Sequence, residues 1–232
     1  MALYAAFSAT VDLLHCIDQD AQHFICASPT IPHADRKFPY VSELPNYHAP
    51  NNKFQFHILR CHSFQDNQSY LYIAQTPDKK EVIVKFTCQY SIALHAFCAD
   101  HGYAPGILGF GTIPGGWFGI AMDYISPTVH PSQSPHLLRL RNKWIGDLRV
   151  LVKSFHDKGL VHGDLREPNI ICDGEQVMLV DFDWGGAAGE ASYPRANLNP
   201  ELIDGRASTD VEITKGDDIR VLENTITKLC NV

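Results

Sequence analysis

The sequence lacks the features of several large classes of protein. None of its seven cysteines forms a C-x-x-C pair, so neither a disulfide framework nor a cysteine zinc site is indicated. No apolar run approaches the length of a membrane span, and the apolar N-terminus carries no basic segment of the kind that opens a signal peptide. We therefore expect no membrane partner and a cytoplasmic, intracellular location.

Basic residues are also scarce. Lys and Arg number 19 against 26 Asp and Glu, which gives a net charge of −7. Proteins that grip a nucleic-acid backbone need clustered basic residues, so we expect no nucleic-acid partner. By contrast, 45% of the residues are hydrophobic and 19% are charged, which is typical of a folded chain. A length of 232 residues fits one compact unit or one unit in two lobes.

Residues 1–53 differ from the rest of the chain. Leu3, Phe7, Val11 and Leu14 recur at helical spacing and predict one short helix. Five prolines then follow between residues 29 and 50, too densely for regular structure. We interpret residues 1–53 as a partly irregular N-terminal extension, residues 54–125 as a first lobe and residues 126–232 as a second, short lobe.

The chain from Phe54 onward reads first as strands and then as helices. Alternating apolar residues and short turns predict five strands, and an apolar stripe predicts one helix among them. These elements lie near residues 54–58, 70–73, 82–86, 90–101 (the helix), 107–110 and 117–124. The second lobe has a predicted long helix from Pro135 to Gly159, short strands near 161, 170–171 and 177–180, and a last helix over 217–229. This order predicts an α+β fold.

Two short segments carry the residues best suited to chemistry. Asp164 and Asn169 lie on a loop between short predicted strands, and Asp181 ends an apolar strand. Carboxylate and amide oxygens of this kind suit Mg²⁺ and leave room for water and phosphate ligands. Arg166 lies beside them and could neutralise a phosphate. Lys85 stands in an apolar strand, where a charge needs a partner or a function.

These segments resemble the signature motifs of protein kinases. The loop over 162–169 is similar to H-R-D-L-x-x-x-N with Gly163 in place of the arginine, and residues 181–183 are similar to D-F-G with Asp183 in place of the glycine. Residues 82–85 resemble V-A-I-K, and residues 199–201 stand where A-P-E would fall. The resemblance covers roughly residues 54 to 230. It implies a two-lobed protein kinase-like fold, with a five-stranded antiparallel sheet plus one helix in the N-lobe and a short, mainly helical C-lobe.

The resemblance also implies a role for each matching residue, with ATP and Mg as cofactors. Asp164, with Arg166 and Asn169 beside it, is the catalytic group that accepts the proton of the substrate hydroxyl. Asn169 and Asp181 hold magnesium on the nucleotide phosphates, Lys85 contacts the α- and β-phosphates, and Arg166 contacts the transferred phosphoryl group. The implied hinge, whose backbone faces adenine, is Met122, Asp123 and Tyr124. Asp218, or Asp217, begins a helix that braces the catalytic loop.

Within this superfamily, two narrower resemblances are present. The H-G-D-L-x-x-x-N pattern is also similar to that of aminoglycoside and choline phosphotransferases. Together with D-F-D-W and a following Tyr-Pro, it resembles the kinase-like proteins of mushroom-forming fungi.

The chain departs from the kinase pattern at four places. No glycine occurs between Leu59 and Ile73, where a Gly-rich loop would cover the phosphates. The helix after Lys85 has Ala93 where a glutamate would stand, so we expect an unpaired lysine with a depressed pKa. His95, the nearest polar residue on that helix, is interpreted as a packed histidine.

The other two departures concern regulation and the end of the chain. Gly163 removes the arginine that pairs with a phosphorylated activation loop, so we expect no regulation of that kind. The sequence stops about one helix after the activation segment. We therefore expect Glu201 to lack a partner, and an exposed apolar stripe at Leu222, Ile226 and Leu229 on which a partner protein could dock.

Two functions remain open at this stage. One is an ATP- and Mg-dependent phosphotransferase that acts on a hydroxyl, either of Ser or Thr in an unidentified protein or of a small molecule. The other is a pseudokinase that serves as a nucleotide-binding or scaffold module, which the missing glycines and Ala93 favour. A third interpretation is that the chain is a fragment of a larger kinase.

Overall fold

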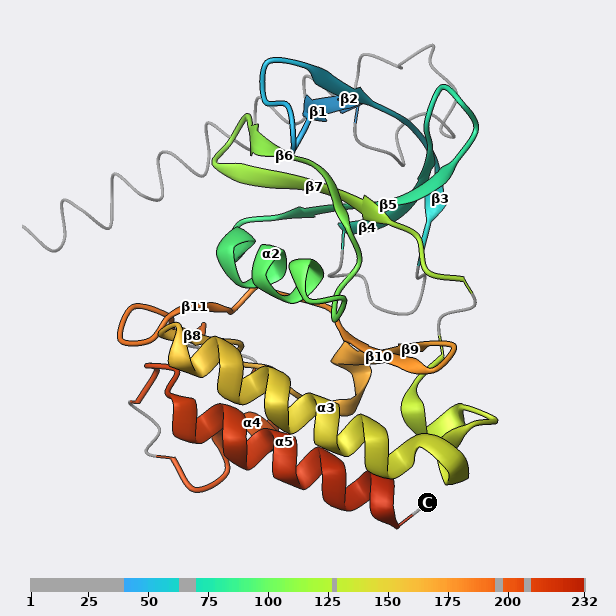
Figure 1. The fold of residues 1–232 in the computed structure, drawn as a ribbon. Helices are drawn as coiled ribbons and strands as arrows, with labels where there is room; N and C mark the ends of the chain where they lie inside the picture. Colours follow the sequence, from blue (N-terminus) through green and yellow to red (C-terminus); the bar gives the residue numbers. More distant parts are fainter. Residues whose placement is uncertain (1–39, 63–69, 127–128, 195–197, 207–209, 232) are drawn as a thin grey trace, which may run out of the picture. The chain divides into compact units, whose positions relative to one another are not determined.

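The computed structural model describes residues 40–62, 70–126, 129–194, 198–206 and 210–231 (Figure 1). The helix predicted over Leu3–Leu14 lies outside these residues. From Tyr40 the described chain forms a β-rich N-terminal lobe followed by a mainly helical C-terminal lobe, which confirms the expected α+β class.

The N-terminal lobe is built on a five-stranded antiparallel sheet, as predicted. Its strands have the spatial order β3-β4-β5-β7-β6. Their bounds are β3 His57–Cys61, β4 Tyr70–Gln75, β5 Glu81–Thr87, β6 Ile107–Ile113 and β7 Trp117–Asp123. The middle strand β5 is apolar and buried between β4 and β7, so it holds Lys85 rigidly in the centre of the sheet.

A short hairpin precedes this sheet. Strand β1 (Glu43–Pro45) pairs with β2 (Lys53–Gln55), so the single strand expected over 54–58 is two strands separated at Phe56. Leu44 is fully buried against Gly119 of β7, where a Cβ atom would lie 2.6 Å from a leucine methyl group. Packing against the sheet therefore begins before residue 54.

Helix α2 (Ile92–Asp100) follows β5 and lies on the side of the sheet that faces the C-terminal lobe (Figure 1). The Ser91 hydroxyl caps it by accepting from the backbone N–H of Leu94, and Gly102 ends it with a φ of 75°. Leu94, His95 and Cys98 form its buried face. The prediction of a helix over 90–101 is confirmed.

Two long helices form the body of the C-terminal lobe. Helix α3 (Leu137–Asp157) and helix α5 (Lys215–Cys230) run side by side (Figure 1), and Arg149 of α3 makes an ion pair with Glu223 of α5. The shorter elements are the 3₁₀ turns Pro131–Gln133 and Glu167–Asn169, β8 Leu160–Val161, β9 Ile170–Asp173, β10 Gln176–Leu179, β11 Gly186–Ala187 and α4 Pro200–Ile203. Trp144 lies fully inside this core and donates its indole N–H to the carbonyl of Glu175.

The prediction of an exposed apolar stripe on the last helix is wrong. Leu222, Ile226 and Leu229 are 2%, 5% and 7% exposed, because this face of α5 packs in the core with α3. Glu201 does have a partner, since Lys228 Nζ lies 2.7 Å from its carboxylate. The basis for a partner protein on that stripe is therefore removed.

Among the described residues, no helix is both long and apolar enough to span a lipid bilayer.

Candidate active site

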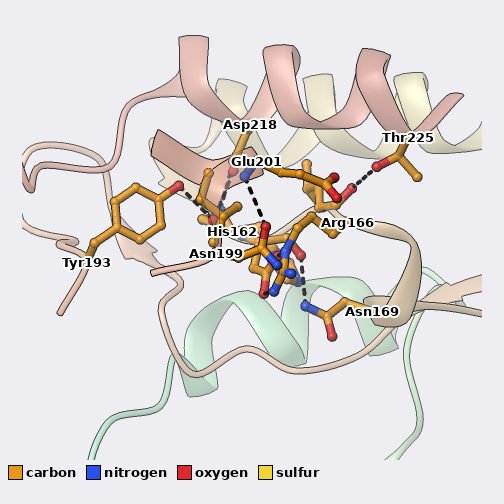
Figure 2. A network of polar contacts seen from close by, with 12 residues as sticks. His162, Arg166, Asn169, Tyr193, Asn199, Glu201, Asp218 and Thr225 are labelled. Atoms are coloured by element: carbon orange, nitrogen blue, oxygen red, sulfur yellow. Dashed lines mark hydrogen bonds and ion pairs between the residues drawn. The ribbon is translucent and has the colours of Figure 1, made fainter. Parts of the chain in front are cut away.

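The loop that follows β8 is held by the N-terminus of helix α5. Asp218 is 1% exposed, and its carboxylate accepts hydrogen bonds from the backbone N–H groups of His162 at 2.8 Å and Gly163 at 2.7 Å (Figure 2). The His156 ring nitrogen Nε2 lies 3.0 Å from the same carboxylate. Thr214 and Asp217 form a capping box that fixes this end of the helix. The expectation that Asp218 braces the loop is confirmed.

Gly163 is required by the backbone at the turn of this loop. Its φ is 84°, a region that side chains disfavour, and a Cβ atom there would lie 2.8 Å from the Ile213 methyl group. Its carbonyl accepts a hydrogen bond from the Tyr193 hydroxyl at 2.7 Å (Figure 2). The chain around Tyr193 and Ile213 thus packs directly on Gly163, so any side chain at this position would meet both a strained backbone and a close contact.

We expect Gly163→Ala to lower the free energy of unfolding by about 1–3 kcal/mol, because it adds a strained backbone and a close contact. Urea unfolding measures this change. Gly146→Ala is the matched control: Gly146 lies in α3 with nothing within 4 Å of an added Cβ, so the same change should stabilise by about 0.5–1 kcal/mol. Equal effects at the two positions would contradict this account of Gly163.

Asp164 is buried, and Arg166 holds its carboxylate with two hydrogen bonds. Arg166 Nε donates to Oδ1 at 2.6 Å and Nη2 donates to Oδ2 at 2.8 Å. Such paired bonds fix the plane of a carboxylate and leave one lone pair on each oxygen for a further proton. The direct contact of Arg166 is therefore with Asp164, and it orients that carboxylate.

Asn169 lies at the end of the same loop, facing one of two cavities. Its side-chain amide nitrogen donates to the backbone carbonyl of Asp164 at 3.0 Å (Figure 2), and its backbone carbonyl accepts from the N–H of Val180. The second bond ties the loop to the chain just before Asp181. Both Asn169 and Asp181 line a cavity of about 300 Å³.

The donor chemistry of these two residues fits a magnesium ion. In the described part of the chain, no three His, Cys, Asp or Glu side chains group into a complete metal site. Mg²⁺ usually takes one or two protein oxygen ligands and completes its shell with phosphate and water, and the side-chain oxygens of Asn169 and Asp181 match such a ligand pair in chemical type.

Lys85 is paired, which overturns the expectation from sequence. Its side chain is 10% exposed, and its ammonium nitrogen lies 2.6 Å from Asp181 Oδ1 and 2.6 Å from Asp183 Oδ1. Burial alone would lower the pKa of Lys85, but the two carboxylates outweigh burial and raise it. The prediction that the pKa of Lys85 is depressed is therefore also wrong.

The two carboxylates that contact Lys85 have pKa values shifted in opposite directions. Burial raises the pKa of Asp183 to about 6, with a further contribution from the neighbouring charge of Asp181. Partial desolvation acts in the same direction on Asp181, whose side chain is 44% exposed, but the Lys85 ammonium outweighs it and lowers the pKa of Asp181. Asp181 also has a φ of 65°, a strained value for a residue with a side chain.

Helix α2 offers no carboxylate to this cluster. Ala93 is exposed, and the side chain that faces the D-F-D segment is His95, whose ring stacks on Phe182 at 4.6 Å. The His95 nitrogens lie 2.8 Å from the Pro105 carbonyl and 2.7 Å from the Tyr90 hydroxyl. Burial lowers the pKa of His95 to about 4, so it is neutral, as its interpretation as a packed histidine requires.

The implied hinge residues line the same cavity as Asn169. Met122, Asp123 and Tyr124 follow one another at the end of β7 on its wall. The Asp123 backbone N–H donates to the Gly106 carbonyl, and its carboxylate pairs with Lys80 at 2.7 Å. These contacts fix where the chain leaves the sheet.

A second cavity of about 590 Å³ adjoins the first, and both are lined by Lys85 and Asp181. Asp164, Arg166 and Asp183 also face the larger one, which has aromatic walls formed by Tyr70, Phe86, Trp117 and Trp184. Trp184 both lines this cavity and packs edge to face on Tyr193, with 5.7 Å between ring centres. Every catalytic and metal residue predicted from sequence thus faces one of these cavities.

Sequence reasoning missed two residues of the site. Asp183 was identified only as a replacement for glycine, and Thr87 was not identified. The signal for Asp183 was a second acid two residues after Asp181, directly behind a strand. The signal for Thr87 was its i+2 spacing from Lys85, which places both side chains on one face of β5.

Comparisons with known proteins give a likeness in structure and none in sequence. No family model and no curated protein matches this chain. Among solved structures, the kinase PK-1 of Cydia pomonella granulovirus is similar, with a TM-score of 0.58, 17% identity, and coverage of 75% of this chain and 70% of that chain. Vaccinia related kinase 3 is similar with a TM-score of 0.57, 16% identity, and coverage of 90% and 72%. Since identities this low show fold alone, the conclusion is that the chain has a protein kinase-like fold.

Proposed function

We propose that this protein is an ATP- and Mg²⁺-dependent phosphotransferase that moves the γ-phosphoryl group to a hydroxyl of an acceptor. The supporting observation is that Asp164, Asn169, Asp181 and Lys85 face two adjoining cavities within a protein kinase-like fold. Such a constellation works by positioning and charge neutralisation, which is how phosphoryl transfer is catalysed.

Each side chain has a defined task in this proposal. The 300 Å³ cavity takes the adenine between the sheet and the C-terminal lobe, beside Met122, Asp123 and Tyr124. Lys85 binds the α- and β-phosphates. Magnesium bound by Asn169 and Asp181 would neutralise phosphate charge.

Asp164 accepts the proton of the acceptor hydroxyl, and Arg166 keeps its carboxylate in one orientation. The 590 Å³ cavity has the size of a small-molecule site, so it would receive the acceptor or the acceptor segment of a protein. The same proposal includes kinship with the kinase-like proteins of mushroom-forming fungi or with the aminoglycoside and choline phosphotransferases. It also includes a cytoplasmic location.

A second function, nucleotide binding without transfer, is favoured by two observations. No glycine stands between Leu59 and Ile73 to let a backbone approach the phosphates closely. Asp181 is held by Lys85 at 2.6 Å, so nucleotide and metal must displace an existing ion pair.

Thermal unfolding with ATP, with and without Mg²⁺, tests the nucleotide site. A ligand at about 100 times its Kd stabilises by about 2.7 kcal/mol, which for a chain of this size raises Tm by roughly 5–10 °C. We expect this rise to require Mg²⁺ and to be lost in Asp181→Ala. Asp173→Ala, an exposed aspartate of β9, is the matched control and should keep the rise.

Transfer itself is measured with ATP labelled at the γ-phosphate. Absence of any thermal shift at millimolar nucleotide would contradict both functions. A Mg-dependent shift without release or transfer of label would support nucleotide binding alone.

A further inference from the structure

Asp183 occupies an unusual place in the cluster around Lys85. Its Oδ1 lies 2.6 Å from the Lys85 ammonium, and its Oδ2 lies 3.1 Å from the Thr87 hydroxyl. Both partners are on β5, two residues apart and on one face of the strand. The carboxylate is therefore contacted at both oxygens by residues of the strand that carries the lysine, at Oδ1 through an ion pair and at Oδ2 through a hydrogen bond.

Helix α2, which follows β5, offers no carboxylate that could replace it. The only acid of helix α2 is Asp100 in its last position, where it is exposed. The buried face of α2 next to Phe182 is occupied by His95, whose two nitrogens are already engaged by Tyr90 and Pro105. Asp181, the other partner of Lys85, is one of the two residues that would hold magnesium.

We infer that Asp183 is the positioning residue for Lys85, holding its ammonium in place when Asp181 is engaged by metal. This inference rests on the proposed function for the metal and the nucleotide. A buried ammonium on a flexible four-carbon stem needs a fixed anionic partner to stay in one orientation. The D-F-D segment supplies that partner directly, so helix α2 does not need a glutamate and Lys85 stays aligned with the phosphates.

A double-mutant cycle tests the inference, using Lys85→Met, Asp183→Asn and the double variant. We expect Asp183→Asn to lower kcat/KM for ATP by about 10- to 100-fold, since misplacing a catalytic group costs this much. In the Lys85→Met background the same change should cost less than 2-fold, because no ammonium remains to be positioned. Asp183→Glu, which keeps the charge on a longer side chain, should recover part of the loss.

A role for Asp183 as a metal ligand predicts a different result. Asp183→Asn would then be equally costly with and without Lys85, and it would raise the Mg²⁺ concentration needed for half-maximal rate. That outcome would overturn the inference. Thr87→Val is a further check, because loss of one hydrogen bond to Asp183 should lower kcat/KM in the same direction but less.

Urea unfolding without nucleotide separates this inference from the proposed function. It is applied to the wild-type protein, Lys85→Met, Asp183→Asn and the double variant. The pairing predicts non-additive effects of Lys85→Met and Asp183→Asn on the unfolding equilibrium constant. If the effects simply add, the pairing of Lys85 with Asp183 is refuted whatever the activity. If they are coupled but the wild-type protein transfers no phosphate, the proposed function has failed and the pairing stands.

Discussion

Replacing Asp218 by alanine is expected to lower the free energy of unfolding by about 3–5 kcal/mol. Asp218 is 1% exposed and accepts the backbone N–H groups of His162 and Gly163, with the His156 ring nitrogen beside them. Alanine leaves these buried donors without an acceptor and opens a gap at the N-terminus of α5. For a chain of this size, about 2–4 °C of Tm corresponds to each kcal/mol, so Tm should fall by roughly 6–20 °C.

Calorimetry and urea unfolding measure this loss, and two variants delimit it. Asp157→Ala is the control, because Asp157 is 64% exposed and only pairs with Lys153 one helical turn away; its Tm should hardly change. Asp218→Asn should be nearly as harmful as Asp218→Ala, since one accepting oxygen becomes a donor that opposes a buried N–H. A fall in Tm no larger than that of Asp157→Ala would show that the loop does not depend on this brace.

The segments of the candidate site could be predicted from sequence because their signals are local. The H-G-D-L-x-x-x-N loop fixes Asp164 and Asn169 five residues apart on one turn, and the apolar run before Asp181 is a strand wherever it occurs in the fold. Strand and helix periodicity likewise predicted the five strands and the helices α2, α3 and α5, and the resemblance to protein kinases implied that the strands form one sheet. Even the brace by Asp218 was expected, since it belongs to the same motif pattern.

The pairing of Lys85 could not be predicted, because it depends on distance between segments far apart in the sequence. Asp181 and Asp183 are 96 and 98 residues from Lys85, and only the packing of the two lobes brings them to 2.6 Å. The burial of Leu222 was missed for a related reason. Periodicity shows that α5 has an apolar face but does not say what covers that face, and here it packs in the core with α3.

Asp164→Asn is expected to lower the rate of phosphoryl transfer by about 10²- to 10⁴-fold while leaving nucleotide binding intact. The amide has nearly the shape of the carboxylate but cannot accept the hydroxyl proton. It also turns one oxygen that Arg166 binds into a donor, so the two hydrogen bonds that orient the group are reduced to one. Both changes act on the step of transfer, since Asp164 lines the 590 Å³ cavity and not the cavity of the hinge residues.

Release of labelled phosphate to water, or its transfer to the protein itself, measures the rate without a known acceptor. The Mg-ATP thermal shift of Asp164→Asn should equal that of the wild-type protein, which separates loss of chemistry from loss of binding. Asp173→Asn, the same substitution at an exposed position of β9, should retain the full rate. An Asp164→Asn protein as fast as wild type would remove Asp164 as proton acceptor. Loss of the thermal shift together with the rate would instead make its main contribution structural, through the Arg166 pair.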